Sequence, residues 1–192
     1  MSLLPRFSLH ASFAFGIGAL ASLALGSEAR ADDNSTAASS APTEEADSPA
    51  MSANRGFSLG LGPTLLLPMR RGGPYGGGLS IDARYGIKTG PLVLAPGALL
   101  SGYAISGRLI GVPLGTFRIT VPIGPFAPFV VGGVGYGWIS NPAESGMAFL
   151  GGGGMVVHVG RVFALGIEAT YQTITTTEFH SVALGPVLIF GG

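Results

Sequence analysis

The sequence predicts an all-β protein, an eight-stranded antiparallel up-and-down transmembrane β-barrel. Three observations lead to this prediction. Hydrophobic residues make up 47% of the 192 residues and charged residues only 10%, against a charged share of about 25% in ordinary soluble domains. All but three of the 33 glycines and all but three of the 14 prolines follow residue 55, which excludes a helical bundle. Apolar and polar residues in the same region alternate with period two, as they do along a strand.

Eight stretches have the length that membrane-crossing strands need. Each is at least 10 residues long, whereas strands of soluble domains usually have five or six residues and tilted membrane strands about 9–11. Pro63 and Pro96 fall inside two of them, where a proline predicts a bulge or a shifted boundary. The predicted strands are residues 56–68, 79–88, 91–105, 111–121, 126–139, 147–159, 163–174 and 180–190.

The scarcity of charge predicts which face of these strands points outward. From residue 56 onward the chain has four acidic and seven basic residues, too few to cover a soluble exterior. We therefore expect the apolar faces to meet lipid and the polar faces to line a narrow lumen. Because buried charges need partners, the strand charges are expected to form a plug of salt bridges, with a gated polar pathway as the alternative. The residues of this predicted polar network are Asp82, Arg84, Lys88, Arg118 and Glu168.

The stretch GPFAPFVVGGVGYGWISNP, residues 124–142, shows both faces in one strand. Phe126, Val130 and Val134 can meet lipid while the intervening glycines leave room inside the barrel. Tyr136 and Trp138 come at the end of this strand, where amphipathic rings favour the level of the lipid headgroups.

The connections between the strands predict an orientation in the membrane. Turns at 88–90, 122–124 and 159–161 are tight, whereas the loops at 68–77, 106–110, 140–146 and 175–179 are expected to be longer. Short turns on the periplasmic side and long loops outside are the layout of an outer-membrane barrel. An even number of strands also brings both ends of the barrel to the periplasmic side.

The first 55 residues have a different composition from the rest. Arg6, an apolar run over residues 11–25 and the small residues Ala29 and Ala31 form the pattern of a secretory signal peptide, residues 1–31, cleaved after Ala31. An uncleaved membrane anchor is the alternative, although the run is short for a spanning helix. Residues 32–55 are rich in Ser, Ala, Pro and acids, and predict a disordered acidic tail that serves as a spacer or as a docking segment.

No arrangement in the sequence predicts catalysis, a cofactor or a metal site. The chain has no cysteine and a formal net charge of zero, so it offers no thiol chemistry and no bulk attraction to nucleic acid. Glu178, His180 and Ser181 are neighbours, but adjacent residues of a strand point to opposite faces and cannot share a proton easily. His158 is expected at the other end of the barrel, too far away to share a metal ion with His180.

Residues 56–192 resemble the OmpA-type eight-stranded outer-membrane β-barrel family. The resemblance rests on the strand spacing, on strand ends such as GVGYGWI and on the pairing of IDARYG with LGIEATYQ. The resemblance implies an outer-membrane location, contact with outer-membrane lipid, no cofactor, and assembly by a machinery that reads an aromatic residue of the last strand. Phe190 matches that residue, although two glycines follow it. The expected role is non-enzymatic, structural or surface-interacting. A narrow pore, a lipid- or ligand-binding barrel and a soluble lipocalin-like carrier are the alternatives.

Overall fold

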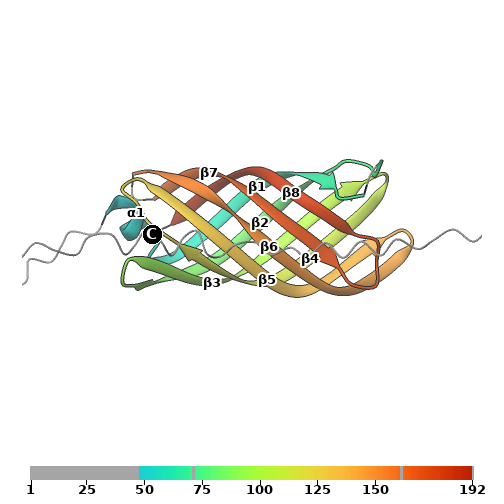
Figure 1. Ribbon diagram of the computed structural model, residues 1–192, viewed down its shortest axis with the longest axis horizontal. Coiled ribbons are helices and arrows are strands. Elements are labelled where there is room, and N and C mark those ends of the chain that lie inside the picture. Colours follow the sequence, from blue (N-terminus) through green and yellow to red (C-terminus); the bar gives the residue numbers. More distant parts are fainter. Residues whose placement is uncertain (1–47, 71, 161, 192) are drawn as a thin grey trace, which may run out of the picture. The chain divides into compact units, whose positions relative to one another are not determined.

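The computed structural model describes residues 48–70, 72–160 and 162–191, and these form a closed barrel of eight strands (Figure 1). Every strand pairs antiparallel with its neighbour in the chain, and the last pairs with the first. The predicted fold class is therefore confirmed. The strands are β1 (Gly56–Pro68), β2 (Gly76–Thr89), β3 (Leu92–Ile105), β4 (Arg108–Thr120), β5 (Phe126–Ser140), β6 (Ala143–Val159), β7 (Phe163–Ile174) and β8 (His180–Gly191).

Several strands extend further than the apolar pattern indicates. Gly77 and Gly78 pair with β3, Arg108 to Ile110 pair with the end of β3, and Ala143 to Gly146 pair with β5, although the pattern predicts loops there. As a result β3 and β4 are joined by residues 106–107 alone, and β5 and β6 by residues 141–142 alone. The expectation of long loops at 106–110 and 140–146 was therefore wrong. A ladder of backbone hydrogen bonds continues past the apolar belt because it does not depend on hydrophobic side chains.

The outside of the barrel is an apolar belt, as the alternation predicts. The outward faces carry exposed Leu59, Ile81 and Ile167, whereas Arg84 and Arg118 on the inward faces are buried. This orientation of the faces is confirmed. The exposed acidic or basic residues that the structure describes on strands, Lys88 and Arg108, each lie within two residues of a strand end.

Inside the barrel, apolar layers lie toward each end and the charged groups lie between them. Leu66 and Ile174, near the ends of β1 and β7, are fully buried at one end. Val93 and Val156, near the start of β3 and the end of β6, are buried at the other. Such layers separate the central polar groups from both mouths of the barrel.

A short helix closes the end where β1 begins. Helix α1 (Pro49–Ala53) starts at Ser48, whose hydroxyl accepts a hydrogen bond from the Met51 backbone at 3.2 Å, a common N-cap arrangement. Ala50 is fully buried and donates its backbone N–H to the Gly124 carbonyl at 3.3 Å. The expected disorder of residues 32–55 was thus wrong for these last residues. Residues 1–47, which include the predicted signal peptide and the cleavage site at Ala31, lie outside the described residues.

The prolines inside strands interrupt ladders without shifting their register. On the β1–β8 ladder, Leu61 pairs with Leu188 and Leu65 with Leu184, four residues further on each strand. On the β2–β3 ladder, Arg84 pairs with Gly97 and Ile87 with Leu94, three residues further on each strand. Neither strand therefore has an extra residue, and the predicted bulges at Pro63 and Pro96 were wrong. Each proline simply lacks the N–H that the ladder would use.

Candidate functional site

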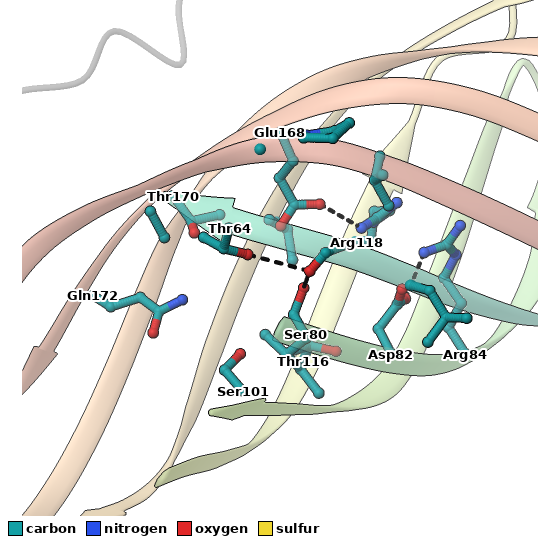
Figure 2. A pocket seen from close by; sticks show the side chains of 18 of the residues that line it. Thr64, Ser80, Asp82, Arg84, Ser101, Thr116, Arg118, Glu168, Thr170 and Gln172 are labelled. Carbon is teal, nitrogen blue, oxygen red and sulfur yellow. Dashed lines mark hydrogen bonds and ion pairs between the residues drawn. The ribbon is translucent and has the colours of Figure 1, made fainter. Parts of the chain in front are cut away.

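The centre of the lumen holds two ion pairs (Figure 2). Asp82 and Arg84 are two residues apart on β2, so they project to the same face of the sheet, and Arg84 Nη1 lies 2.5 Å from Asp82 Oδ2. Arg118 on β4 and Glu168 on β7 meet across the lumen, with Arg118 Nη2 at 3.0 Å from Glu168 Oε2. Four of the five residues predicted to share the lumen are thus paired there.

Aromatic and glycine neighbours make room for the pair that crosses the lumen. The Arg118 guanidinium carbon lies 3.9 Å from the centre of the Phe129 ring, a favourable contact between a cation and an aromatic face. Glu168 stands opposite Gly154 on β6 and Gly185 on β8. A side chain at Gly154 would collide with Phe129 and the backbone at Ile167. Glycine on either side of Glu168 therefore gives its carboxylate space to reach Arg118.

Lys88, the fifth residue of the predicted network, lies elsewhere. It is the second-last residue of β2 and is exposed, and it does not line the pocket that holds the other four. The alternation puts Lys88 on the same face of β2 as Asp82 and Arg84, but it lies beyond the enclosed part of the barrel. The alternation predicts the face of a residue and not its height along the barrel axis.

The polar groups surround a cavity of about 40 Å³, space for about three water molecules. Three buried atoms on its lining have no hydrogen-bond partner within 3.5 Å in the described part of the chain: Arg84 Nη2, Ser101 Oγ and Gln172 Oε1. The Tyr103 hydroxyl, on the same lining, interacts with the side chains of Ser101 and Gln172. Ser101 is fully buried and Gln172 is 2% exposed. Buried polar groups normally have partners, so these three atoms mark the cavity as a place for water or for a polar ligand.

Sequence reasoning missed Ser101 and Gln172, although a signal for both was present. Gln172 lies four residues after Glu168 on β7, and the period of two puts them on one face. Ser101 interrupts an apolar strand and pairs with Ser80 of β2. An uncharged polar residue on an inward face is the signal that would have added them.

The aromatic residues predicted for the headgroup level lie near the two ends of the outward belt. Tyr136 and Trp138 are exposed near the end of β5, where the Tyr136 hydroxyl donates to Ser145 Oγ at 2.6 Å. Phe190 is exposed near the end of β8, with its ring centre 5.5 Å from that of Phe163. Because β5 and β8 end at opposite mouths of the barrel, these residues belong to two separate aromatic rims.

His158 and His180, the two histidines that the structure describes, lie at opposite ends of the barrel. His158 Nε2 lies 3.2 Å from Asn54 Nδ2 at the helix end of the barrel, whereas His180 lies at the other end with Nδ1 at 2.9 Å from Thr173 Oγ1. His180 is exposed and Ser181 is buried, so they face opposite sides of the wall. Among the described residues there is no group of three acidic or histidine side chains that could hold a metal ion.

No helix within residues 48–70, 72–160 and 162–191 is long and apolar enough to cross a membrane.

Comparisons with known proteins identify the fold. No family model and no curated protein matches the chain. Among solved structures, the chain is similar to Neisserial surface protein A (NspA), with a TM-score of 0.58 and 12% identity over 71% of this chain and 97% of that one. It is also similar to Ail, the attachment invasion locus protein of Yersinia pestis, with a TM-score of 0.53 and 12% identity over 71% of this chain and 98% of that one. The chain therefore has the eight-stranded fold of the outer-membrane β-barrels, as the sequence resemblance implied.

Proposed function

We propose that the chain is an integral β-barrel protein of the Gram-negative outer membrane, with a non-enzymatic structural or surface-interaction role. The observation that supports this most is the apolar belt on a barrel whose paired charges lie inside. A soluble carrier would place these faces the other way round, because water solvates charge and excludes large apolar surfaces. Outer-membrane lipid is then the first partner, and a barrel-assembly machinery acts during biogenesis.

The proposed role also follows from how the lumen is filled. Apolar layers at both ends, helix α1 at one mouth and two central ion pairs leave a small cavity and favour a plugged barrel over an open pore. The exposed connections at the mouth away from α1 are the segments that can meet an external partner. Arg70 and Glu178 join two of these connections through an ion pair of 2.9 Å.

Cell fractionation combined with gel mobility before and after heating tests this proposal. We expect the chain in the outer-membrane fraction and a mobility that changes on heating, because a detergent-resistant barrel unfolds only when heated. Mass spectrometry of the purified chain should give Asp32 as the first residue, as cleavage after Ala31 requires. A chain that stays in the soluble fraction without detergent contradicts the membrane location.

Ligand binding inside the barrel is a second candidate function, and the unpartnered atoms around the cavity favour it. A narrow pore is distinguished from both by planar-bilayer recording. The plugged barrel predicts no discrete conductance steps, whereas a pore predicts steps that change in Arg118→Ala.

A further inference from the structure

The joint between β1 and β8 is interrupted where two prolines face each other. Pairing stops after Leu61 and Leu188 and resumes at Leu65 and Leu184. In the register that these pairs define, Pro63 stands opposite Pro186. Neither residue has an N–H to donate. We call this stretch, residues 62–64 of β1 and 185–187 of β8, the proline seam.

The wall at the proline seam is thin as well as weakly bonded. Gly62 and Gly185 occupy the inward positions, and a Cβ atom on Gly185 would lie 2.1 Å from the Pro63 carbonyl oxygen. The Gly62 carbonyl accepts from two inward side chains, Ser80 Oγ at 3.1 Å and Thr64 Oγ1 at 3.4 Å. Inward hydroxyls thus satisfy this carbonyl, and the strands can separate here with the smallest loss of ladder hydrogen bonds.

The cavity reaches the proline seam from inside. Its lining includes Gly62, Gly185 and two residues of the outward faces, Leu61 and Pro186. Gly62 at the seam pairs with Ser80 on β2, and Ser80 pairs in turn with Ser101 on β3. Ser101 Oγ and Gln172 Oε1 are two of the unpartnered atoms. Figure 2 shows both residues on the side of the cavity away from the Asp82–Arg84 pair.

We propose that this cavity binds the head group of a neutral single-chain lipid, which enters sideways from the membrane through the proline seam. This inference rests on the proposed membrane location and names a ligand class for the second candidate function. A cavity of about 40 Å³ holds only a few heavy atoms, so the hydrocarbon chain stays outside, along Leu61 and Leu184 of the belt.

The two unpartnered atoms away from the Asp82–Arg84 pair, Ser101 Oγ and Gln172 Oε1, define the head group. Gln172 Oε1 can only accept a hydrogen bond, and the Ser101 hydroxyl can donate or accept. A head group with one hydroxyl satisfies both. An added charge is disfavoured, because the two arginines of the lumen are already balanced by two carboxylates and an unpaired buried charge is costly. The ligand is therefore a long-chain alcohol or another single-chain lipid with an uncharged hydroxyl head.

The first test uses dodecanol with a photoreactive diazirine on its chain, added to the refolded full chain in phosphatidylcholine vesicles. We expect saturable labelling of β1 and β8 next to the proline seam. The corresponding dodecyl methyl ether, which cannot donate to Gln172, should bind about tenfold more weakly, the change that losing one hydrogen bond gives in a buried site. In Gln172→Met this preference for the alcohol should disappear, whereas a purely structural role of Gln172 would leave it unchanged.

The second test locks the seam. The chain has no cysteine, so Leu65→Cys/Leu184→Cys, a paired outward position directly beside the seam, can form a unique cross-link that leaves both prolines in place. Oxidation should abolish the saturable labelling and a reductant should restore it. Val134→Cys/Phe149→Cys, a paired outward position on β5 and β6, is the matched control and should have no effect.

Labelling spread evenly around the belt, or labelling unchanged by the seam cross-link, overturns the inference. If Gln172→Met fails to fold, Ser101→Ala takes its place: both the alcohol and the ether lose a donor and should bind more weakly, while the preference for the alcohol remains because Gln172 can still accept. Heat-dependent mobility is measured on the same samples. A membrane barrel without saturable labelling refutes this inference alone, whereas a soluble chain refutes the proposed function as well.

Discussion

Arg118 on β4 and Glu168 on β7 form an ion pair of 3.0 Å between strands that are not neighbours in the barrel. This contact crosses the lumen and is independent of the backbone ladders. Arg118 is almost fully buried, whereas the Glu168 side chain keeps 23% of its surface exposed. Removing either partner leaves the other charge enclosed without compensation.

Arg118→Met should therefore lower the free energy of unfolding by about 3 kcal/mol, in the range found when one partner of a buried pair is removed. The double variant Arg118→Met/Glu168→Met should recover most of this loss, because no uncompensated charge remains. Urea unfolding in lipid vesicles measures both. Arg70→Ala, which breaks the exposed pair with Glu178, is the control and should cost about 0.5 kcal/mol or less. Equal losses in the single and double variants would contradict the assigned pairing.

A charge placed on the belt should be costly in proportion to its depth. Ile81→Arg, near the middle of β2, should lower the free energy of unfolding in vesicles by about 2–4 kcal/mol. Val159→Arg, at the last residue of β6, is the matched control and should lower it by only about 0–1 kcal/mol. The same urea titration compares them. If the two variants cost the same, the outward face does not lie in hydrocarbon.

Trp138 is the only tryptophan of the chain, so its fluorescence reports on one aromatic rim. Its ring covers Gly111 of β4, where a Cβ atom would lie 2.1 Å from Trp138 Cζ2. Gly111→Val should displace the ring and shift its emission. Gly115→Val is the control, since the atom nearest to an added Cβ would be the Val134 carbonyl oxygen at 3.7 Å. Lipids brominated near the headgroup should quench Trp138 more strongly than lipids brominated near the end of the acyl chain.

Helix α1 should protect the chain against proteolysis at Arg55. Asn54 connects the helix to the barrel through His158 Nε2 at 3.2 Å and donates to the Ala50 carbonyl at 2.7 Å. Asn54→Ala removes both contacts, so trypsin should cleave the folded barrel after Arg55 faster than in the unchanged chain. Asn141→Ala, in the two-residue connection at the other mouth, should leave this cleavage rate unchanged.

Phe190 should matter for assembly more than for stability, if the machinery reads the last strand as the family resemblance implies. Phe190→Ala should reduce the fraction of heat-modifiable barrel in cells. Phe57→Ala changes an exposed aromatic residue near the same mouth, on β1, and should assemble normally. A normal yield for Phe190→Ala would show that recognition uses another part of β8.

The barrel can be predicted from the sequence because the alternation of apolar and polar residues shows which face of the wall each strand residue occupies. Ile81 and Asp82 differ in polarity as their positions in the wall require, and the same holds for Ile167 and Glu168. The alternation does not show how far along the barrel axis a residue lies. Lys88 was therefore placed in the lumen although it lies at a strand end. The alternation also does not show where a strand ends. Backbone hydrogen bonds extend β2 and β6 beyond their apolar parts, in β6 as far as polar residues such as Ser145.

The cavity was harder to predict than the ion pairs. Charged residues in an apolar chain are conspicuous, whereas Ser101 and Gln172 become informative only once their burial and lack of partners are known. Pro63 is conspicuous in the sequence, but a proline inside a strand predicts a bulge or a shifted boundary. Its partner Pro186 comes opposite it only through the closure of the barrel, a relationship between residues more than a hundred positions apart.

The up-and-down order of the strands has a consequence for the connectivity of the chain. Seven of the eight joints link strands that follow one another in sequence, and only β1–β8 links the two ends, with Ser58 beside Gly191. A circular permutant that joins the end of β8 to the start of β1 and opens the chain between β6 and β7 would keep every strand in place. In such a molecule the joint with the opposed prolines would become an ordinary hairpin.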